Sequence, residues 1–485
     1  MREKTKDVIV RLAAPEFEQL TNLLLRRYPH FEWAAFVRFG WRETRDTLVL
    51  ALAALDSASE GELDEEVGHV KITEPYTLRI ALQSETHKLA VGIIHSHPEN
   101  YAPRPSPIDD DMDAYYSKYF GDFAKERPYI SLIFSRVNSE LILSGRVYWN
   151  NSWLPVTRFI VERTPVETWV NGYPPQENED NQRHRTVRFT DAFGEQASRR
   201  LRQATVAVIG AGGTGSIVIE VLARAGVGKL IIADPDYLSE SNLERVHGSR
   251  PDQVGQFKVA VAKEHIQSIN PDCKVEAYIG SLPQQEIVDA VITADVALGC
   301  TDQQHSRLAL SDICLRYLVP SIDCGVMLEG SQGVVTGQVI QLVRFLAADP
   351  CALCRDMIQP GRITEELMSD EEKRARQSAA EEAILRGEDP NPYWRGLPQL
   401  NTVGYLTGIA GAMTAGFAIG WLTGRFDPAF SRTQMNLVAE YFDVTDNPQL
   451  AREHCVCRSI RGWADQGIAD ALISAPSHWA PVRTL

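Results

Sequence analysis

Five apolar runs of strand length lie within the first 160 residues of the chain. Helical patterns at 15–28 and 109–123 frame these runs, with apolar residues three or four positions apart. Short strands mixed with amphipathic helices predict a compact α+β domain over residues 1–160. The five predicted strands are WAAFVRFG (33–40), TLVLALAAL (47–55), LAVGIIHS (89–96), YISLIFSR (129–136) and ELILSGRVYW (140–149).

The pattern changes beyond residue 160. Residues 161–200 contain the polar, turn-rich stretch VETWVNGYPPQENEDNQRHRT and then an arginine-bearing helix, so we expect a linker there. From residue 201 to 485 the pattern becomes strand, helix, strand, beginning with TVAVIGAGGTGS, IVIEVLARAG and KLIIAD. Further strands at DVALGCTD and PSIDCG fit a mostly parallel sheet. The chain is therefore expected to be α/β, with an α+β domain followed by a Rossmann-like domain.

Two later stretches, residues 403–424 and 362–396, differ from the rest of the chain in their charge. Residues 403–424, VGYLTGIAGAMTAGFAIGWLTG, carry no charge and are long enough to span a membrane. They are rich in Gly, Ala and Thr and lack basic flanks, which favours a buried helix and no membrane span. Residues 362–396 are charged and helix-prone, which predicts an exposed crossing segment.

Composition narrows the function classes. The net charge of the 485-residue chain is -15, which argues against nucleic-acid binding because that needs a basic face. Eight cysteines do not make a disulfide scaffold at this length, and the N-terminus has no signal-peptide core. We therefore expect a cytoplasmic, reducing setting, in which paired cysteines indicate metal or redox chemistry.

Histidines and a carboxylate gather around the strand predicted at 89–96. His95 and His97 stand at i and i+2 on an extended segment, so their side chains point the same way. Imidazole suits zinc, Asp109 can give a third ligand, and a hydrolytic site leaves the fourth place to water. Such a site needs a general base, and Glu32 begins the strand that can lie beside His95. The alternative is a polar loop whose histidines bind nothing.

The order Glu, His-Ser-His-Pro, Ser-x-x-Asp resembles the JAMM (JAB/MPN) metalloproteases, which remove or trim ubiquitin-like proteins. The resemblance covers residues 10–155. It implies a catalytic zinc with three protein ligands, a base that activates water and a serine that stabilises the tetrahedral intermediate. In this sequence the ligands would be His95, His97 and Asp109, the base Glu32 and the serine Ser106.

The spacing departs from that family at one point. Eight residues, PENYAPRP, separate His97 from Ser106, where the family usually has seven. The Ser-x-x-Asp spacing is intact, so we interpret the difference as a one-residue loop insertion. Asp110 and Asp111 remain possible substitutes for Asp109. A JAMM fold that has lost activity and only binds a partner is the alternative.

A glycine-rich segment, VAVIGAGGTGS (206–216), predicts a strand, a tight loop and the start of a helix. Its glycines let backbone N–H groups approach a phosphate at the helix N-terminus. The next strand ends in ADPD, which places Asp234 to bind ribose hydroxyls. Alone, this pattern fits any nucleotide or dinucleotide, NAD included. The segments that follow, SESNLERV, GQFKVAVAK and LGCTDQQHSR, are unlike those of dehydrogenases.

Those segments resemble the ThiF-type adenylating fold, shared by ubiquitin-activating enzymes and bacterial sulfur-transfer relatives, over residues 180–460. The resemblance implies ATP and Mg²⁺, and a homodimer in which an arginine reaches the partner's ATP; Arg185 is the first choice and Arg183 the second. Attack of a carboxylate on an α-phosphate needs charge neutralisation more than acid–base groups. A degenerate fold kept as a scaffold is the alternative. The implied site residues are Gly210, Gly212, Gly213 and Gly215 in the loop, Asp234 for ribose, Asn242, Arg245 and Lys258 for phosphates, and Asp302 for magnesium.

Four cysteines form two short pairs about a hundred residues apart, which suits a closed tetrahedral structural zinc. The ThiF-type family commonly has two Cys-x-x-Cys pairs that flank its crossing segment, and here the second pair is Cys-x-Cys. The alternative is two unconnected pairs of free thiols. The four residues are Cys351, Cys354, Cys455 and Cys457.

The two resemblances together imply a bifunctional enzyme that trims or removes a ubiquitin-like protein and adenylates its C-terminal carboxylate. Such fusions resemble bacterial ubiquitin-like conjugation systems, some of them linked to phage defence, and a conjugating enzyme is the expected partner. Residues 355–454 contain no Cys for a thioester, so direct transfer to a partner is favoured. Ser369, Ser378 and Cys324 stay open as nucleophiles. The rival functions are adenylation of a sulfur carrier and a non-catalytic scaffold that binds a ubiquitin-like tail.

Overall fold

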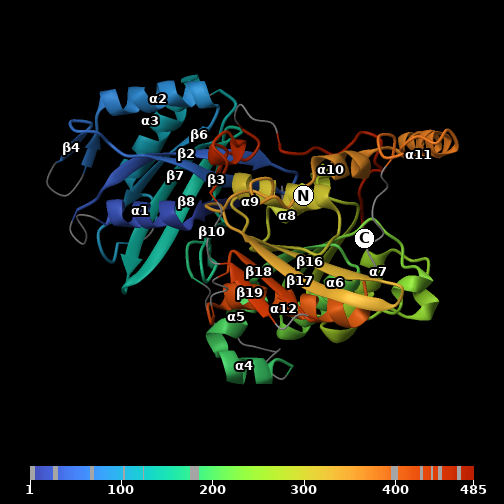
Figure 1. Cartoon of the computed structure of the whole chain (residues 1–485). Coiled ribbons are helices and arrows are strands. Elements are labelled where there is room, and N and C mark those ends of the chain that lie inside the picture. Colours follow the sequence, from blue (N-terminus) through green and yellow to red (C-terminus); the bar gives the residue numbers. More distant parts are fainter. Residues whose placement is uncertain are drawn as a thin grey trace.

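The computed structural model describes residues 6–25, 31–65, 70–101, 104–123, 125–174, 185–394, 402–426, 430–438, 441–445, 450–466 and 471–485. Within these ranges the chain forms two nine-stranded sheets, one from each half of the sequence, that lie against each other (Figure 1). A small hairpin of β4 (Leu63–Glu65) and β5 (Val70–Ile72) stands apart from both sheets.

The first sheet is covered by helices on both faces, so its central strands are mostly buried on both sides. Helix α1 (Ala14–Leu24) packs on one face, and α2 (Glu74–His87) and α3 (Pro107–Phe123) pack on the other (Figure 1). All five strands predicted for this region are confirmed, as β2, β3, β6, β7 and β8. The strand order is β11 (Glu167–Val170), β10 (Arg158–Glu162), β1 (Asp7–Ala13), β3 (Thr47–Asp56), β2 (Ala34–Glu43), β6 (Ala90–Ser96), β7 (Tyr129–Val137), β8 (Glu140–Trp149) and β9 (Ser152–Pro155).

Strand β10, which crosses residue 160, and strand β11 beyond it also belong to this first sheet. Strand β10 pairs in parallel with β1, and β11 pairs with β10, so the sheet continues to Val170 and past the predicted boundary. These strands are short, and the partner of β10 lies about 150 positions earlier, so a local pattern could not reveal the pairing. The arginine-bearing region that follows forms α4 (Val187–Phe193) and α5 (Glu195–Gln203).

The second sheet has a parallel centre and antiparallel edges, so the prediction of a mostly parallel sheet holds only for its centre. Strands β16, β15, β12, β13 and β14 are parallel, whereas β17, β18 and β19 at one edge and β20 at the other are antiparallel. The order is β19 (Tyr441–Thr445), β18 (Arg432–Asn436), β17 (Val334–Phe345), β16 (Ser321–Ser331), β15 (Val296–Gly299), β12 (Thr205–Ile209), β13 (Lys229–Ala233), β14 (Lys274–Ile279) and β20 (Arg483–Thr484).

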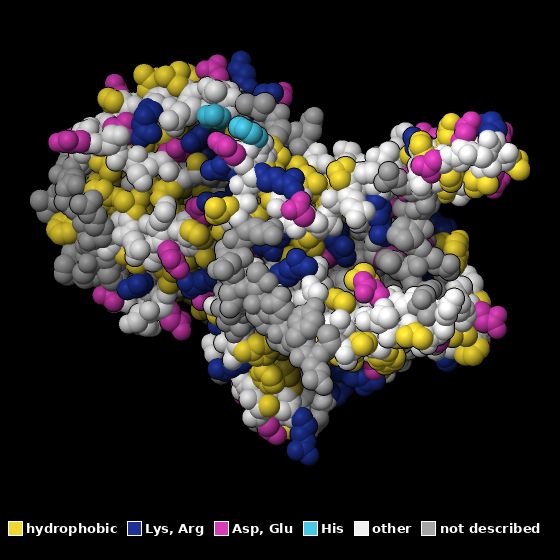
Figure 2. Space-filling view, viewed as in Figure 1, with side chains coloured by type: hydrophobic (Ala, Val, Ile, Leu, Met, Phe, Trp, Pro, Cys, Tyr) yellow, Lys and Arg dark blue, Asp and Glu magenta, His cyan; other side chains and the backbone are white. Residues whose placement is uncertain are grey.

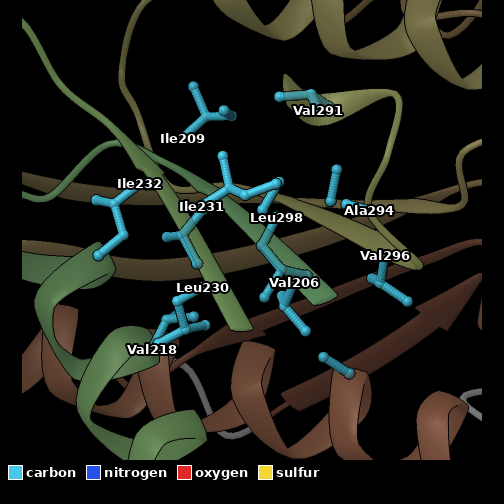
Figure 3. Close-up of a cluster of buried hydrophobic side chains, with 14 of the residues drawn as sticks. Val206, Ile209, Val218, Leu230, Ile231, Ile232, Val291, Ala294, Val296 and Leu298 are labelled. Carbon is cyan, nitrogen blue, oxygen red and sulfur yellow. The ribbon is translucent and has the colours of Figure 1, made fainter. Parts of the chain in front are cut away.

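Helices cover both faces of the second sheet and complete its core. Val206, Leu230, Ile232 and Leu298 of the central strands are fully buried among them (Figure 3). On one face lie α6 (Gly213–Ala225), α7 (Lys258–Ile269) and α12 (Gly404–Thr423), and on the other lie α8 (Gln285–Val291) and α9 (Gln304–Tyr317) (Figure 1).

Helix α12 corresponds to the uncharged stretch at 403–424. Among the described residues it alone is long and apolar enough to cross a membrane, but 67% of its apolar window is buried inside the protein. It packs against α6, α5 and strand β16. Gly411 lies so close to α6 that a Cβ atom there would come within 2.7 Å of the Thr214 carbonyl oxygen. The small residues therefore serve close helix packing, as predicted.

The two halves share one interior. Ile9, Val49 and Ile160 of the first sheet belong to the same buried cluster as the core of the second sheet. The fully buried Arg11 on β1 donates to the carbonyl oxygens of Leu318 (3.0 Å) and Ala294 (2.9 Å) across the boundary. Three buried polar contacts inside an apolar interface stabilise one relative orientation of the halves, because a displaced Arg11 would lose all its partners.

The predicted crossing segment forms two helices with different surroundings. Helix α10 (Pro360–Leu367) packs on α9, whereas α11 (Asp370–Leu385) buries only Ala380 and Ala383. Helix α11 forms an arm that stands out from the body of the molecule (Figures 1 and 2). The expected exposed segment is thus α11, and α10 is part of the folded body.

Candidate functional site

The structure brings His95, His97 and Asp109 together at one end of strand β6. The His95 and His97 Nε2 atoms are 3.2 Å apart, and each lies 3.1–3.3 Å from an Asp109 carboxylate oxygen. All three side chains are buried. Burial alone would raise the pKa of Asp109, but hydrogen bonds from the two imidazoles hold it well below its usual range. Three buried donor atoms that converge on one point form the kind of set that holds a metal ion.

Glu32 and Ser106 flank this cluster. Ala34 pairs with His95, and the Ser96 N–H donates to the Trp33 carbonyl, so the next step of the ladder brings Glu32 alongside His97. Ser106 immediately precedes helix α3, and its Oγ accepts from the Asp109 N–H at 3.2 Å. The Ser106 N–H in turn donates to Asp109 Oδ2 at 2.6 Å, which orients the carboxylate toward the histidines.

The alternatives to Asp109 face elsewhere. Asp110 forms an ion pair with Arg146 on β8 at 2.7 Å, and Asp111 is exposed on the outer side of α3. Arg146 also pairs with Asp113, which is completely buried, at 2.6 Å. This network fixes the first turn of α3 on the sheet and so positions Asp109. Sequence reasoning missed it because nothing in the local pattern connects β8 to α3.

The second candidate site is a cavity of about 710 Å³ at the carboxyl ends of the parallel strands in the second sheet. Its wall combines the glycine loop with polar residues from four later segments, which is where open α/β sheets bind ligands. Gly215, the last glycine of the predicted loop, does not line the cavity and packs against the backbone of Gly210. The predicted residues on the wall are Gly210, Gly212, Gly213, Asp234, Asn242, Arg245, Lys258 and Asp302.

Two glycines of the loop are required by close backbone approaches. Gly210 has φ of +100°, and a Cβ atom there would lie 2.6 Å from the Cys300 carbonyl oxygen. A Cβ atom on Gly215 would lie 1.9 Å from the Gly210 carbonyl oxygen, so the loop can turn into α6 only without a side chain there. In contrast, nothing lies within 4 Å of the Cβ position of Gly212, which faces open space in the cavity.

Charged side chains of the cavity are held by neighbouring groups. Asp234 is buried and accepts from the Ala211 N–H (2.7 Å) and the Asp236 N–H (2.9 Å). Burial raises the pKa of Asp234, an effect that nearby Lys258 opposes. Lys258 begins α7 and pairs with Asp236 at 2.7 Å. The wall can therefore accept hydroxyl donors near Asp234 and anionic groups near Lys258.

Arg185 lies outside the cavity. It precedes α4, and its guanidinium pairs with Asp272 at 3.1 Å, with half of its side chain exposed. It does not line the cavity wall of its own chain. Arg183 lies outside the described residues.

Four cysteines form a third cluster beside α9. The Sγ atoms of Cys351 and Cys455 are 3.6 Å apart, those of Cys354 and Cys457 are 3.8 Å apart, and all four lie within 4.8 Å of one another. These separations exceed a disulfide bond of about 2 Å. They match the roughly 3.8 Å expected between thiolates at the corners of a zinc tetrahedron. The cluster can therefore hold a metal ion.

The candidate nucleophiles have other roles or low reactivity. Cys324 lines the cavity, but burial raises the pKa of its thiol to about 12, which disfavours the reactive thiolate. Ser369 caps α11, where its Oγ accepts from the Glu372 N–H. Ser378 is exposed on the same helix.

Comparison with known proteins identifies a family for the second half of the chain. The ThiF family profile matches residues 184–459, and residues 1–183 lie outside that match. Three curated proteins resemble about a third of this chain. They are "Adenylyltransferase and sulfurtransferase UBA4" of Candida albicans (32% identical over 163 residues, 33% of this chain), "Ubiquitin-like modifier-activating enzyme 5" of Drosophila willistoni (33% over 176, 33% of this chain) and "Protein HesA" of Leptolyngbya boryana (33% over 155, 32% of this chain).

The matched regions span 36%, 42% and 55% of the lengths of these three relatives, so each relative contains much that this chain does not match. The family match, in contrast, covers more than half of this chain and includes the whole wall of the large cavity. The glycine loop, Asp234, Lys258 and Asp302 all fall inside it. The chain therefore belongs to the ThiF family.

Proposed function

We propose that the second half of the chain uses ATP and Mg²⁺ to adenylate the C-terminal carboxylate of a ubiquitin-like protein. The observation that carries this proposal is the 710 Å³ cavity, which gathers the glycine loop, a buried ribose-type carboxylate and the cationic and acidic groups suited to a phosphate chain. The names of two relatives, an adenylyltransferase and a ubiquitin-like modifier-activating enzyme, support the same reaction.

The wall residues supply binding and charge neutralisation. Asp234 binds the ribose hydroxyls, and backbone N–H groups at the start of α6 face the phosphates. The substrate carboxylate attacks the α-phosphorus, an acyl–phosphate bond forms, and pyrophosphate leaves. Arg245 and Lys258 balance the charge that develops on the phosphate oxygens, and Asp302 would hold the magnesium ion, which would neutralise further phosphate charge. No side chain has to take a proton, because the carboxylate is already ionised.

The Asp302→Ala variant tests this reaction. We expect ATP–pyrophosphate exchange, measured with the ubiquitin-like protein encoded nearest to this chain, to fall by about 100-fold or more because the magnesium ligand is lost. The matched control, Asp252→Ala, removes an exposed carboxylate outside the cavity and should leave exchange unchanged. A parent protein without exchange, or an unaffected Asp302→Ala variant, contradicts the proposal.

We also propose a zinc peptidase in the first half of the chain, which trims the same ubiquitin-like protein or removes it from targets. Its support is the buried cluster of His95, His97 and Asp109, with Glu32 alongside. A zinc ion bound there supplies a polarised water and an electrophile for the carbonyl oxygen. Glu32 would accept a proton from the attacking water, and the Ser106 hydroxyl would donate to the developing oxyanion.

Neighbouring aspartates give a matched test of that site. Asp109→Asn should remove one zinc per chain, measured by elemental mass spectrometry, and abolish cleavage of a C-terminally extended ubiquitin-like precursor. Asp111→Asn changes an exposed residue on the same helix turn and should keep both the zinc and the cleavage. Equal metal content in parent and Asp109→Asn protein would rule out this ligand set.

Two features of the larger assembly belong to the same proposal. Arg185, exposed and outside its own cavity, completes the ATP site of a second copy in a homodimer. The acyl-adenylate passes directly to a conjugating enzyme, because burial raises the pKa of both thiols on the cavity wall, Cys300 and Cys324.

Sulfur-carrier activation is a second candidate, and the name of the relative from Candida albicans favours it. The product distinguishes the two functions. Intact mass spectrometry of the ubiquitin-like protein should show an amide or ester conjugate in the first case and a thiocarboxylate in the second.

A further inference from the structure

Helix α10 of the crossing segment forms part of the cavity wall. The helix packs on α9, which follows Asp302 in the chain (Figure 1). From its first turn Arg362 lines the cavity, and its Nη2 donates to the Asp302 carbonyl oxygen at 3.1 Å. A segment that was expected to be solvent-exposed therefore brings a guanidinium group beside Asp302, the aspartate proposed to bind magnesium.

The position of Arg362 is set by a buried carboxylate one turn later. Glu366 is only 4% exposed and accepts from Arg362 Nε at 3.1 Å. It also accepts from the Gln304 N–H (3.0 Å), the His305 N–H (2.9 Å) and His305 Nδ1 (2.9 Å) at the start of α9. Glu366 thus fastens α10 to the N-terminus of α9, where the helix dipole favours a negative charge.

Two other cations of the cavity wall are likewise held by carboxylates. Lys258 pairs with Asp236 at 2.7 Å, and the nearly buried Arg307 pairs with Asp323 at 2.6 Å. Arg362 donates from Nε to Glu366 and from Nη2 to the Asp302 carbonyl oxygen. These two hydrogen bonds hold the plane of its guanidinium group at the edge of the cavity. A fixed guanidinium suits an oxyanion with two oxygens, such as a phosphate.

We propose that Arg362 binds the phosphate chain of the nucleotide beside Asp302, and that Glu366 is its positioning residue. This inference rests on the proposed nucleotide site and extends it. The crossing segment then becomes part of ATP recognition, so the cavity is complete only when α10 is docked on α9. Sequence reasoning assigned no role to either residue, because their partners lie about 60 positions earlier.

Calorimetric titration with MgATP and with adenosine separates a phosphate contact from a general change in the wall. Arg362→Ala should weaken MgATP binding by about 10- to 100-fold, the range for a lost charge-assisted hydrogen bond, and leave adenosine binding unchanged. Arg374→Ala, on the exposed face of α11, is the matched control and should bind both ligands as the parent does. Equal weakening of both ligands, or no weakening of MgATP, overturns the assignment of Arg362. A parent protein that binds no MgATP overturns the nucleotide site itself.

A double-variant cycle tests the role of Glu366. Glu366→Gln keeps the shape of the side chain but removes its charge, and should weaken MgATP binding less than Arg362→Ala does. If Glu366 acts through Arg362, adding Glu366→Gln to Arg362→Ala should cause no further loss of MgATP affinity. Additive losses would mean that Glu366 affects the cavity independently of Arg362.

Discussion

Replacement of Cys354 by serine is expected to remove one zinc ion per chain and to lower the unfolding temperature by about 10 °C or more. Cys354 lies in the loop after β17, and its Sγ is close to that of Cys457, more than a hundred positions later. A metal ion bound by both residues would therefore close a long loop of the chain. Metal bound only by the folded state adds its binding free energy to stability. We therefore propose a structural zinc held by Cys351, Cys354, Cys455 and Cys457.

The measurement combines elemental mass spectrometry with thermal unfolding. Cys273→Ala is the matched control, because Cys273 is also buried but lies outside the cluster, at the start of β14. It should keep the full zinc content. A Cys354→Ser protein with the zinc content of the parent would show that the four thiols do not form a zinc site.

Replacement of Glu162 by glutamine is expected to remove most of a pH dependence of stability between pH 5 and pH 8. Glu162 ends β10 at the boundary between the two halves, where its carboxylate accepts from the Ala347 N–H at 2.7 Å. Burial, reinforced by the charge of Asp349, raises the pKa of Glu162 from its ordinary 4.5 to about 8. The folded protein therefore keeps a proton that the unfolded chain has already lost.

The sign follows from that difference in bound protons. This group leaves the stability of the folded state unchanged below about pH 4.5. The stability falls as the pH rises toward 8 and changes no further above it, by a total of roughly 5 kcal/mol. Urea unfolding of the parent at pH 5.5, 7 and 8.5 should show this decline, and Glu162→Gln should show much less of it. Glu167→Gln on β11, where the carboxylate is partly exposed, is the control. Parallel curves for parent and Glu162→Gln would contradict a raised pKa.

Local patterns were sufficient for most of the regular elements. Alternating or continuous apolar runs located β2, β3, β6, β7 and β8, and the switch to a strand, glycine loop and helix located β12 and α6. The shared direction of His95 and His97 also followed from a local rule, since alternate residues on a strand share one side. That Asp109 joins them was expected from the resemblance to the metalloproteases, and the structure brings the three side chains together. The assignment of chemistry to each of these residues remains a prediction.

Contacts between distant segments were not accessible to such rules. Helix α2 has a weak apolar stripe, and the edges of the second sheet depend on strands that return from far along the chain. Arg146 and Glu366 each position a site from another element, and neither spacing nor composition marks them. Their contributions depend on tertiary packing, which decides where a charged side chain finds its partners.

The buried contact of Arg11 across the two halves has a practical consequence for dissecting the protein. Truncation before β12 would leave the carbonyl groups of Leu318, Ile292 and Ala294 without their donor and would uncover the apolar surface that Ile9 and Val49 now cover. Activities measured on separately expressed halves would therefore reflect the exposure of this apolar interface and not the chemistry of each site. Genetic separation of the two proposed activities requires point substitutions inside an intact chain.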